Sequence, residues 1–169
     1  MAGQGELWHR RWPEGWVAIQ PGGRAPAPGA LALVQAFINT HYDLVVEQGA
    51  ELLATPAQAG SWLSGQRLTE PGVDVDEQDR QRLVALREGL RGLARANSDR
   101  ASPQHSIDAV NAAVGRASIV LRFTAHGPGC MPASPGVGGA VSILAAITAQ
   151  TMLDGRWSRL KVCPGEHCD

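Results

Sequence analysis

Two cysteines near the end of the chain give the strongest chemical signal in the sequence. Cys163 and Cys168 enclose Pro164-Gly165-Glu166-His167, and Asp169 follows them. A Cys-Pro turn of this kind points backbone N–H groups at the thiolate sulfur, which helps to hold its charge when a metal binds. Because a structural zinc takes four protein ligands in a closed tetrahedron, the sequence predicts half of a zinc site, with Cys163 and Cys168 as its ligands.

Two other interpretations of this segment stay open. His167 lies between the thiols and could replace one of them as a ligand, although its position next to Cys168 makes joint chelation awkward. The two cysteines could also fall close together by chance. A total of three cysteines, an odd number, fits a reducing compartment and metal binding better than a framework of disulfides.

A second group of residues could bind a small molecule. A mostly apolar helix is expected over residues 30–42, and polar side chains occupy its C-terminal end. If buried there, these side chains must find hydrogen-bond partners or line a cavity. An arginine in a strand expected over residues 119–124 must reach a carboxylate, a bound anion or water. Structural pairing or simple exposure is the plainer interpretation of this arginine. The hypothesis is a mostly apolar pocket with a few convergent donors, lined by Asn39, Tyr42, Trp62, Arg122 and His126.

The alternative hypothesis is that the helical domain is itself an enzyme or a small-molecule binding protein. The sequence contains no Walker or dinucleotide phosphate loop, no His-Glu-x-x-His helix and no Gly-x-Ser-x-Gly elbow. Cys130 follows His126 by four residues, but a thiolate–imidazole pair needs a geometry that spacing alone does not supply. In this alternative the residues expected to act are Arg122, Tyr42, His126 or Cys130.

The clearest predicted element is a helix from about Asp76 to Asn97, in which leucines recur at steps of three and four residues. On another face Arg87, Arg91 and Arg95 stand four residues apart, which costs a few tenths of a kcal/mol per pair unless something offsets it. Glu88 can reach Arg91 and offsets part of this cost. The simplest interpretation is a solvated face, and the alternative is an anion-binding or interface ridge.

Further helices are predicted on both sides of this one. Thr55-Pro56-Ala57-Gln58 is typical of a helix start, with a hydroxyl cap and proline at the first position. Ile107 to Arg116 favours a helix with Ser106 as its cap, and Val137 to Leu153 favours an apolar helix that Gly155 ends. Two other expected elements are a strand at residues 16–19 and the helix at residues 30–42.

The hydrophobic period changes after residue 118. Ile119, Leu121 and Phe123 alternate with other residues, which is the pattern of a half-buried strand. A turn at residues 126–129 then allows residues 130–133 to return as a short partner strand, with Pro132 at an edge position. The sequence therefore predicts an α+β fold, a helix-rich single domain with a small antiparallel sheet or hairpin.

Composition sets the remaining limits. A chain of 169 residues with 44% hydrophobic residues can bury the core of one compact domain. Its net charge is −1 and Lys161 is its only lysine, so bulk electrostatics give no argument for binding nucleic acid or membranes. The first residues lack a signal sequence, and no apolar run is long enough to span a bilayer. We expect a soluble cytoplasmic protein without membrane contact.

Four segments resemble the bacterial CGNR zinc-finger proteins, whose N-terminal region is called the ABATE domain and which are described as stress-induced transcription regulators. The resemblance rests on the order of these segments and on the final Arg-Leu-Lys-Val-Cys-Pro passage. The matching segments are residues 30–40, Thr55-Pro56 with Trp62-Leu63, the helix over residues 83–97, and residues 157–163.

In that family a second cysteine pair and a Cys-Gly-Asn-Arg signature complete a zinc ribbon. The resemblance implies a transcription regulator whose ribbon contacts DNA, while the region before it senses a small-molecule ligand or assembles as a homodimer. Only Cys163 and Cys168 carry over, as zinc ligands. We expect residues 1–155 to form the sensing or assembly domain and residues 156–169 the first half of a truncated ribbon, with DNA bound only through the missing C-terminal region.

Overall fold

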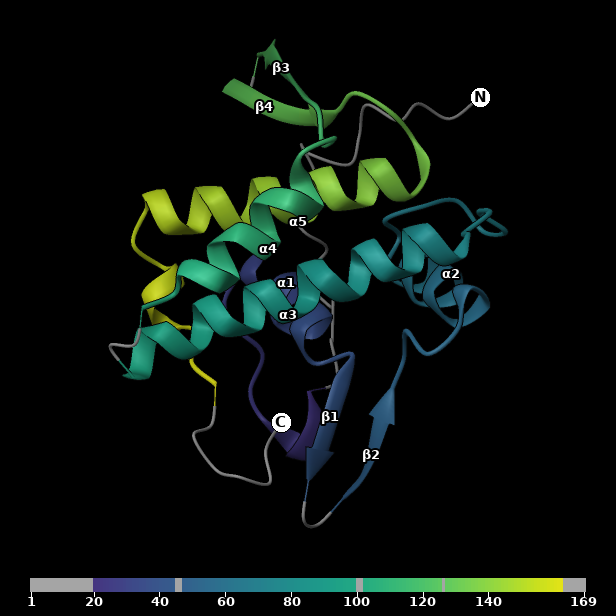
Figure 1. The fold of residues 1–169 in the computed structure, drawn as a ribbon. Helices are drawn as coiled ribbons and strands as arrows, with labels where there is room; N and C mark the ends of the chain where they lie inside the picture. Colours follow the sequence, from purple (N-terminus) through teal and green to yellow (C-terminus); the bar gives the residue numbers. More distant parts are fainter. Residues whose placement is uncertain (1–19, 45–46, 100–101, 126, 163–169) are drawn as a thin grey trace.

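The computed structural model describes residues 20–162 except 45–46, 100–101 and 126 (Figure 1). Within these residues the chain forms helices, two antiparallel hairpins and two short 3-10 turns, η2 (Pro21–Gly23) and η3 (Trp157–Arg159). The helices are α1 (Leu31–Ile38), α2 (Pro56–Gly65), α3 (Glu77–Asp99), α4 (Gln104–Val114) and α5 (Gly136–Leu153). The strands are β1 (His41–Leu44), β2 (Glu47–Glu51), β3 (Ile119–Thr124) and β4 (Gly127–Pro132). This architecture confirms the predicted helix-rich α+β fold.

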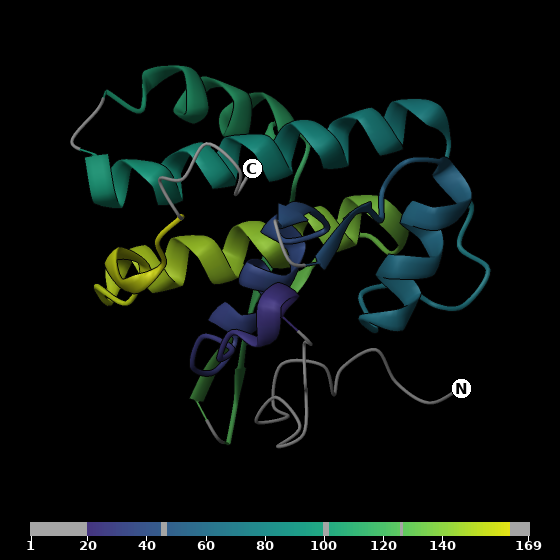
Figure 2. The ribbon, with the colours of Figure 1, turned by 90° about the horizontal axis from the view of Figure 1, so that it is seen from below.

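The two hairpins lie at opposite ends of a helical body (Figure 1). Helix α4 packs along α3, and α1 packs against both α3 and α5. Seen from below, α3 and α4 lie side by side in one layer and α5 lies in the next (Figure 2). Hairpin β1–β2 packs against η2 and is joined to α3 by hydrogen bonds from Arg87 and Arg91, whereas β4 packs against α5.

A single apolar cluster fills the space between these helices. Helix α1 is the most deeply buried element, since Leu31, Leu33, Val34 and Phe37 are each at most 1% exposed. A helix of only 8 residues is unstable by itself in water, so contacts with other helices must supply most of the stability of α1. The cluster continues through α3 and α5, where it includes Leu83, Leu86, Leu90, Ala140, Val141 and Leu144.

Contrary to the expectation that no apolar run is long enough to span a bilayer, helix α5 is long and apolar enough to do so by length and composition alone, with a mean hydropathy of 1.5. However, 56% of this 18-residue window is buried inside the fold. Burial on this scale is typical of a core helix. The helix ends at Leu153, and Gly155, predicted to stop it, follows the capping residue Asp154 with a φ of 75°.

Two glycines allow α4 to lie very close to α3. A Cβ added at Gly89 would lie 2.7 Å from Cγ2 of Val110 and 3.1 Å from its backbone N, and one at Gly92 would overlap the Ser106 side chain. Ser106 therefore lies inside this helix contact, and the prediction that it caps α4 is wrong. The helix begins at Gln104, with Pro103 in the capping position.

Local sequence signals placed two other helix starts correctly. The Thr55 hydroxyl accepts a hydrogen bond from the Gln58 N–H at 3.2 Å, and Pro56 is the first residue of α2. Helix α3 begins one residue after Asp76, whose carboxylate accepts a hydrogen bond from the Asp79 N–H at 2.7 Å. In both cases a side chain satisfies a backbone donor that the first helical turn leaves unpaired.

The helix predicted over residues 30–42 ends early, at Ile38. His41 and Tyr42 lie in β1, where they pair with Glu51 and Ala50. The prediction was wrong because the short β2 segment, Glu47–Glu51, lacks the apolar alternation that indicates a strand. The pairing of β1 with β2 could therefore not be predicted from the sequence. The strand predicted over residues 16–19 lies outside the described residues.

The predicted hairpin forms, with Ile119 opposite Pro132 and Thr124 opposite Gly127. The predicted turn at residues 126–129 is wrong, because β4 already begins at Gly127 and ends at Pro132. The predicted half-burial of β3 is also wrong. Leu121 is 65% exposed and Phe123 is 82% exposed. The apolar alternation is real, but β4 is the strand that packs against α5, so the fold described here does not cover β3.

Candidate functional site

The residues predicted to bind a ligand lie in two separate regions. Asn39 follows α1, and its Nδ2 donates a hydrogen bond to Oε1 of Gln20 at 2.6 Å. Tyr42 lies three residues further on, in β1. Trp62 of α2 is half-buried, with its ring centroid 5.5 Å from that of Phe37 in α1. The structure therefore places these three predicted residues around α1 and its C-terminal end.

Arg122 lies apart from them. It is exposed in β3, opposite Gly129, and belongs to the hairpin at the other end of the molecule (Figure 1). His126 lies outside the described residues. The partly exposed Cys130 is in β4 opposite Leu121 and forms no disulfide. Arg122 and Tyr42 are therefore not brought to one site.

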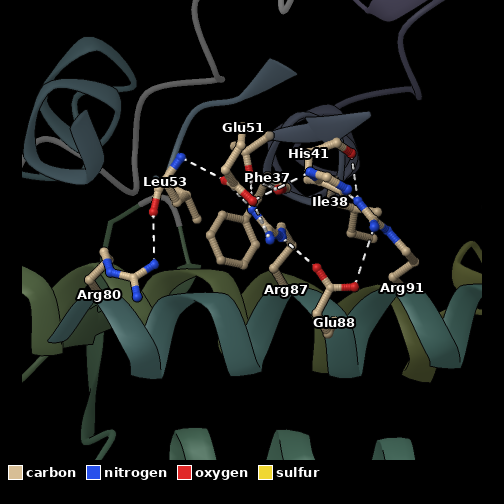
Figure 3. Close-up of polar contacts among 10 residues, drawn as sticks. Phe37, Ile38, His41, Glu51, Leu53, Arg80, Arg87, Glu88 and Arg91 are labelled. Carbon is tan, nitrogen blue, oxygen red and sulfur yellow. Dashed lines mark hydrogen bonds and ion pairs between the residues drawn. The ribbon is translucent and has the colours of Figure 1, made fainter. Parts of the chain in front are cut away.

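The arginine row of α3 forms a buried polar centre that the sequence did not predict. Arg87 is 3% exposed and Arg91 is 9% exposed, whereas Arg95 is exposed. The interpretation of this row as a solvated face is thus wrong for two of its three members. The physical reason is that the β1–β2 hairpin and the end of α1 cover this face of the helix (Figure 3).

Arg87 is held by carboxylates on two elements. Its Nη1 and Nη2 donate to the two Glu51 oxygens at 2.6 and 2.8 Å, and its Nε donates to Oε1 of Glu88 at 2.7 Å (Figure 3). A further contact joins Nη1 to the Thr40 hydroxyl at 3.3 Å. The planar guanidinium suits this two-point recognition of a carboxylate. Residue Glu51 of β2 is thereby tied to the middle of α3.

Arg91 satisfies backbone carbonyls at the end of α1. Its Nη2 donates to the carbonyl oxygens of Ile38 and His41 at 2.7 and 2.6 Å, and its Nη1 lies 3.3 Å from Oε2 of Glu88. The last carbonyls of a helix have no partner within it, so this arginine closes the C-terminal end of α1. Glu88, shared between Arg87 and Arg91, reduces the repulsion between the two cations.

The electrostatics of this centre favour its ionised form. Burial alone would raise the pKa of the Glu51 carboxyl, but hydrogen bonds from Arg87 and from the Leu53 N–H hold it below its ordinary value of 4.5. Burial alone would lower the pKa of Arg87, whereas its hydrogen bonds to Glu51 and Glu88 raise it. The ion pair therefore persists at neutral pH and stabilises the contact between hairpin and helix.

The stability of the domain should fall in acid because of Glu51. Its pKa is lower in the folded chain than in the unfolded chain, so the unfolded chain takes up the proton first as the pH falls. The stabilisation is present above the ordinary value of 4.5 and is lost as the pH falls through the folded-state pKa. Urea midpoints measured between about pH 7 and pH 3 should fall less steeply in Glu51→Gln than in the unmodified chain.

The matched control is Glu70→Gln, which removes an exposed carboxylate from the connection between α2 and α3. This variant should keep the pH dependence of the unmodified chain. If Glu51→Gln keeps it too, the ion pair with Arg87 does not contribute to stability as argued.

The segment after α5 is fixed to the C-terminal end of α3. We call residues 157–162 the stem, because they lead directly to Cys163. Trp157 and Leu160 are 6% and 8% exposed, and their carbonyl oxygens accept hydrogen bonds from Nδ2 of Asn97 at 3.0 and 2.8 Å. Val162 also packs against the core. The last described residues before the cysteines therefore pack on the helical core.

A cavity of about 280 Å³ lies between the stem and the start of α1. Its volume is just below the usual range for ligand sites, roughly 300–1,000 Å³. The Gln35 amide oxygen accepts a hydrogen bond from the Ala27 N–H at 2.6 Å and steadies one wall. The exposed cations Arg159 and Lys161 belong to the stem side. The lining residues are Ala25, Ala27, Pro28, Leu31, Gln35, Arg159, Leu160 and Lys161.

The part of the chain that the structure describes contains no cluster of three or more histidine, cysteine or acidic side chains that could hold a metal. Cys163 and Cys168 lie outside the described residues. As a donor set, two thiolates fit half of a tetrahedral zinc site.

Comparison with known proteins identifies the family. Neither a curated protein nor a solved structure matches the chain. Residues 31–154 match the model of one family, ABATE, described as "putative stress-induced transcription regulator". The match begins with α1 and runs one residue past α5, so it covers both hairpins and the arginine centre and leaves the stem and the cysteine pair outside. The chain therefore belongs to the ABATE family of transcription regulators.

Proposed function

We propose that this chain is the ligand-sensing or dimerising domain of a cytoplasmic transcription regulator whose DNA-binding end is a zinc ribbon that begins at Cys163 and Cys168. The observation that carries this proposal is the anchored stem. Asn97 of α3 holds the carbonyls of Trp157 and Leu160, so the chain enters the cysteine pair from a fixed point on the core.

Helix α3 is the element that could relay a signal to this point. Its first half holds hairpin β1–β2 through Arg87, and Arg80 donates to the carbonyl of Leu53, just after the hairpin, at 3.2 Å. Its last turns hold the stem through Asn97. Since a helix of 23 residues is about 35 Å long, one rigid rod joins the hairpin at one end of the domain to the entry of the ribbon.

The sensing role is supported by the cavity beside the stem. A molecule bound there would touch α1 on one side and Leu160 on the other. Arg159 and Lys161 favour an anionic group on such a ligand. The same cavity also favours the alternative function, a small-molecule binding protein or an enzyme that uses a pocket in the helical domain.

The ribbon role is supported by the donor set. Cys163 and Cys168 would supply two thiolates, and a second cysteine pair would complete the tetrahedron. Zinc would then supply the folding energy of the ribbon. Arg156, Arg159 and Lys161 make a small basic footprint, so the phosphate contacts that dominate DNA affinity would lie in the rest of the ribbon.

Zinc content tests this proposal directly. We expect a chain extended through a second cysteine pair to bind about one zinc ion per chain, measured by atomic emission after dialysis, and to lose it in Cys163→Ser and Cys168→Ser. Cys130→Ser is the matched control and should keep the metal, because Cys130 lies in β4. Equal zinc in the short and extended chains, or none in the extended chain, would contradict the ribbon.

A further inference from the structure

Strand β3 presents large apolar side chains to solvent on both of its faces. Soluble domains rarely leave a contiguous apolar patch of this kind uncovered unless it binds something. Ile119 and Val120, which point to opposite faces, are 42% and 45% exposed, and Leu121 and Phe123 are still more exposed. Figure 1 shows β4 between β3 and the helices, so β3 is the outer strand of its hairpin.

The two edges of this hairpin differ in their capacity to accept another strand. β4 contains Pro128 and Pro132, which have no backbone N–H and therefore interrupt a hydrogen-bond ladder. β3, with the sequence Ile-Val-Leu-Arg-Phe-Thr, contains no proline. An exposed strand edge without proline and with a single charge is a ready template for pairing. The outer edge of β3 is thus the edge that can extend the sheet.

We propose that β3 pairs antiparallel with β3 of a second copy of this chain, which joins two hairpins into a four-stranded sheet. The strand is self-complementary about Leu121. In the register centred there, Leu121 lies opposite the partner's Leu121, and Ile119 lies opposite the partner's Phe123. Directly opposed side chains share one face of a sheet, so each copy completes an apolar stripe with the other.

Charge excludes one register of this pairing. With Leu121 at the centre, Arg122 lies opposite the partner's Val120, and the two arginines are not in direct opposition. A shift that centres the pair on Arg122 would place the two cations directly opposite each other, which is destabilising. The single charge therefore disfavours that alignment. Of the others, the alignment centred on Leu121 buries Phe123 against an isoleucine, whereas one centred on Val120 would place Phe123 opposite the partner's Ala117, outside the strand.

The expected dimer is weak. A pair of six-residue strands buries less than the roughly 800 Å² per partner of a standard stable interface, so monomer and dimer should exchange with concentration. This inference rests on the dimerising role in the proposed function and assigns the outer edge of β3 as the surface through which the chain dimerises. It uses neither the cysteine pair nor the stem.

Sedimentation equilibrium over about 5–500 µM protein tests the surface. We expect the average mass of the full chain to rise from monomer towards dimer, and Leu121→Lys to remain a monomer throughout. Leu153→Lys is the matched control, since Leu153 is an 84% exposed leucine at the end of α5. It should associate like the unmodified chain. Circular dichroism of both variants checks that they are folded.

Two results would overturn the proposal. One is an unmodified chain that stays monomeric, which would mean that another partner or another segment of the same chain covers β3. The other is Leu121→Lys that associates normally. Zinc binding by the extended chain should be unchanged in Leu121→Lys, so a failed dimer and a failed ribbon are distinguishable.

Cysteine cross-linking tests the register. In a background with Cys130, Cys163 and Cys168 changed to serine, Leu121→Cys should oxidise to a covalent dimer, because each thiol faces its own copy across the two-fold axis. Val120→Cys faces Arg122 of the other copy and should cross-link several-fold less. Equal cross-linking of the two variants, or none in either, contradicts the proposed alignment.

Discussion

Replacing Glu51 by alanine is expected to lower the free energy of unfolding by about 2–3 kcal/mol. The change leaves the Arg87 guanidinium, whose side chain is 4% exposed, without its two-point partner. Removing one member of a buried ion pair typically costs about 3–5 kcal/mol. We expect less because the Glu51 side chain is 32% exposed and Glu88 still accepts from Nε of Arg87. Urea unfolding followed by far-UV circular dichroism measures the difference.

A double variant separates the cost of an unpaired charge from the strength of the pair. Glu51→Leu with Arg87→Met replaces both charges by apolar groups of similar length and should recover most of the stability lost in Glu51→Ala. The exposed change Glu70→Ala should alter stability by less than about 0.5 kcal/mol. If Glu51→Ala behaves like Glu70→Ala, the contact between β2 and α3 does not hold the domain together.

The second large effect is expected from Phe37→Ala, which should lower the free energy of unfolding by about 4 kcal/mol. Phe37 is 0% exposed in α1. Its ring packs beside Trp62, and its carbonyl accepts a hydrogen bond from the Thr40 hydroxyl at 2.8 Å. The alanine variant removes the buried ring and leaves a cavity among large neighbours that can only partly close.

The chain supplies its own control, because it has two phenylalanines. Phe123 is 82% exposed in β3, and Phe123→Ala should change stability by less than about 0.5 kcal/mol in dilute, monomeric protein. The comparison uses one chemical change at two sites and the same urea titration. Equal losses at the two positions would mean that their burial is not as described.

The contrast between these two phenylalanines marks a limit of sequence pattern. Phe37 lies in an apolar helical run and Phe123 in an apolar alternation, and each pattern predicts an inward side chain. Periodicity reports which residues share a face of an element, but only a neighbouring element decides whether that face is covered. α3 and α5 cover α1, whereas the fold packs β4 against α5 and leaves β3 open.

The candidate site shows the same limit more strongly. Arg87 and Glu51 are 36 residues apart in the chain, and Arg91 and Ile38 are 53 residues apart. The spacing of residues in the sequence predicted the row of arginines, the repulsion among them, and a partial compensation of that repulsion by Glu88. The pairing of Arg87 with Glu51 could not be predicted from the sequence, because Glu51 reaches Arg87 only after the unpredicted hairpin β1–β2 has formed.

The sequence by itself determined the elements whose causes are local. Thr55 with Pro56 set the start of α2, the spacing of leucines set the inner face of α3, and Gly155 set the end of α5. These signals act within a few residues along the chain and therefore survive without tertiary context. The cysteine pair is local in the same sense, and the prediction that it binds zinc rests on residue type and spacing.

Only the tertiary structure decided which polar and apolar faces are covered. It buried Arg87 and Arg91, fixed the stem to Asn97 and left Phe123 in solvent. The physical reason is that burial is a property of two surfaces, and the sequence of one element does not specify which other element will reach it. The arginines of α3 stabilise the interior because the Glu51 carboxylate packs against them. The apolar strand β3 remains an exposed edge because none of the packed helices covers it.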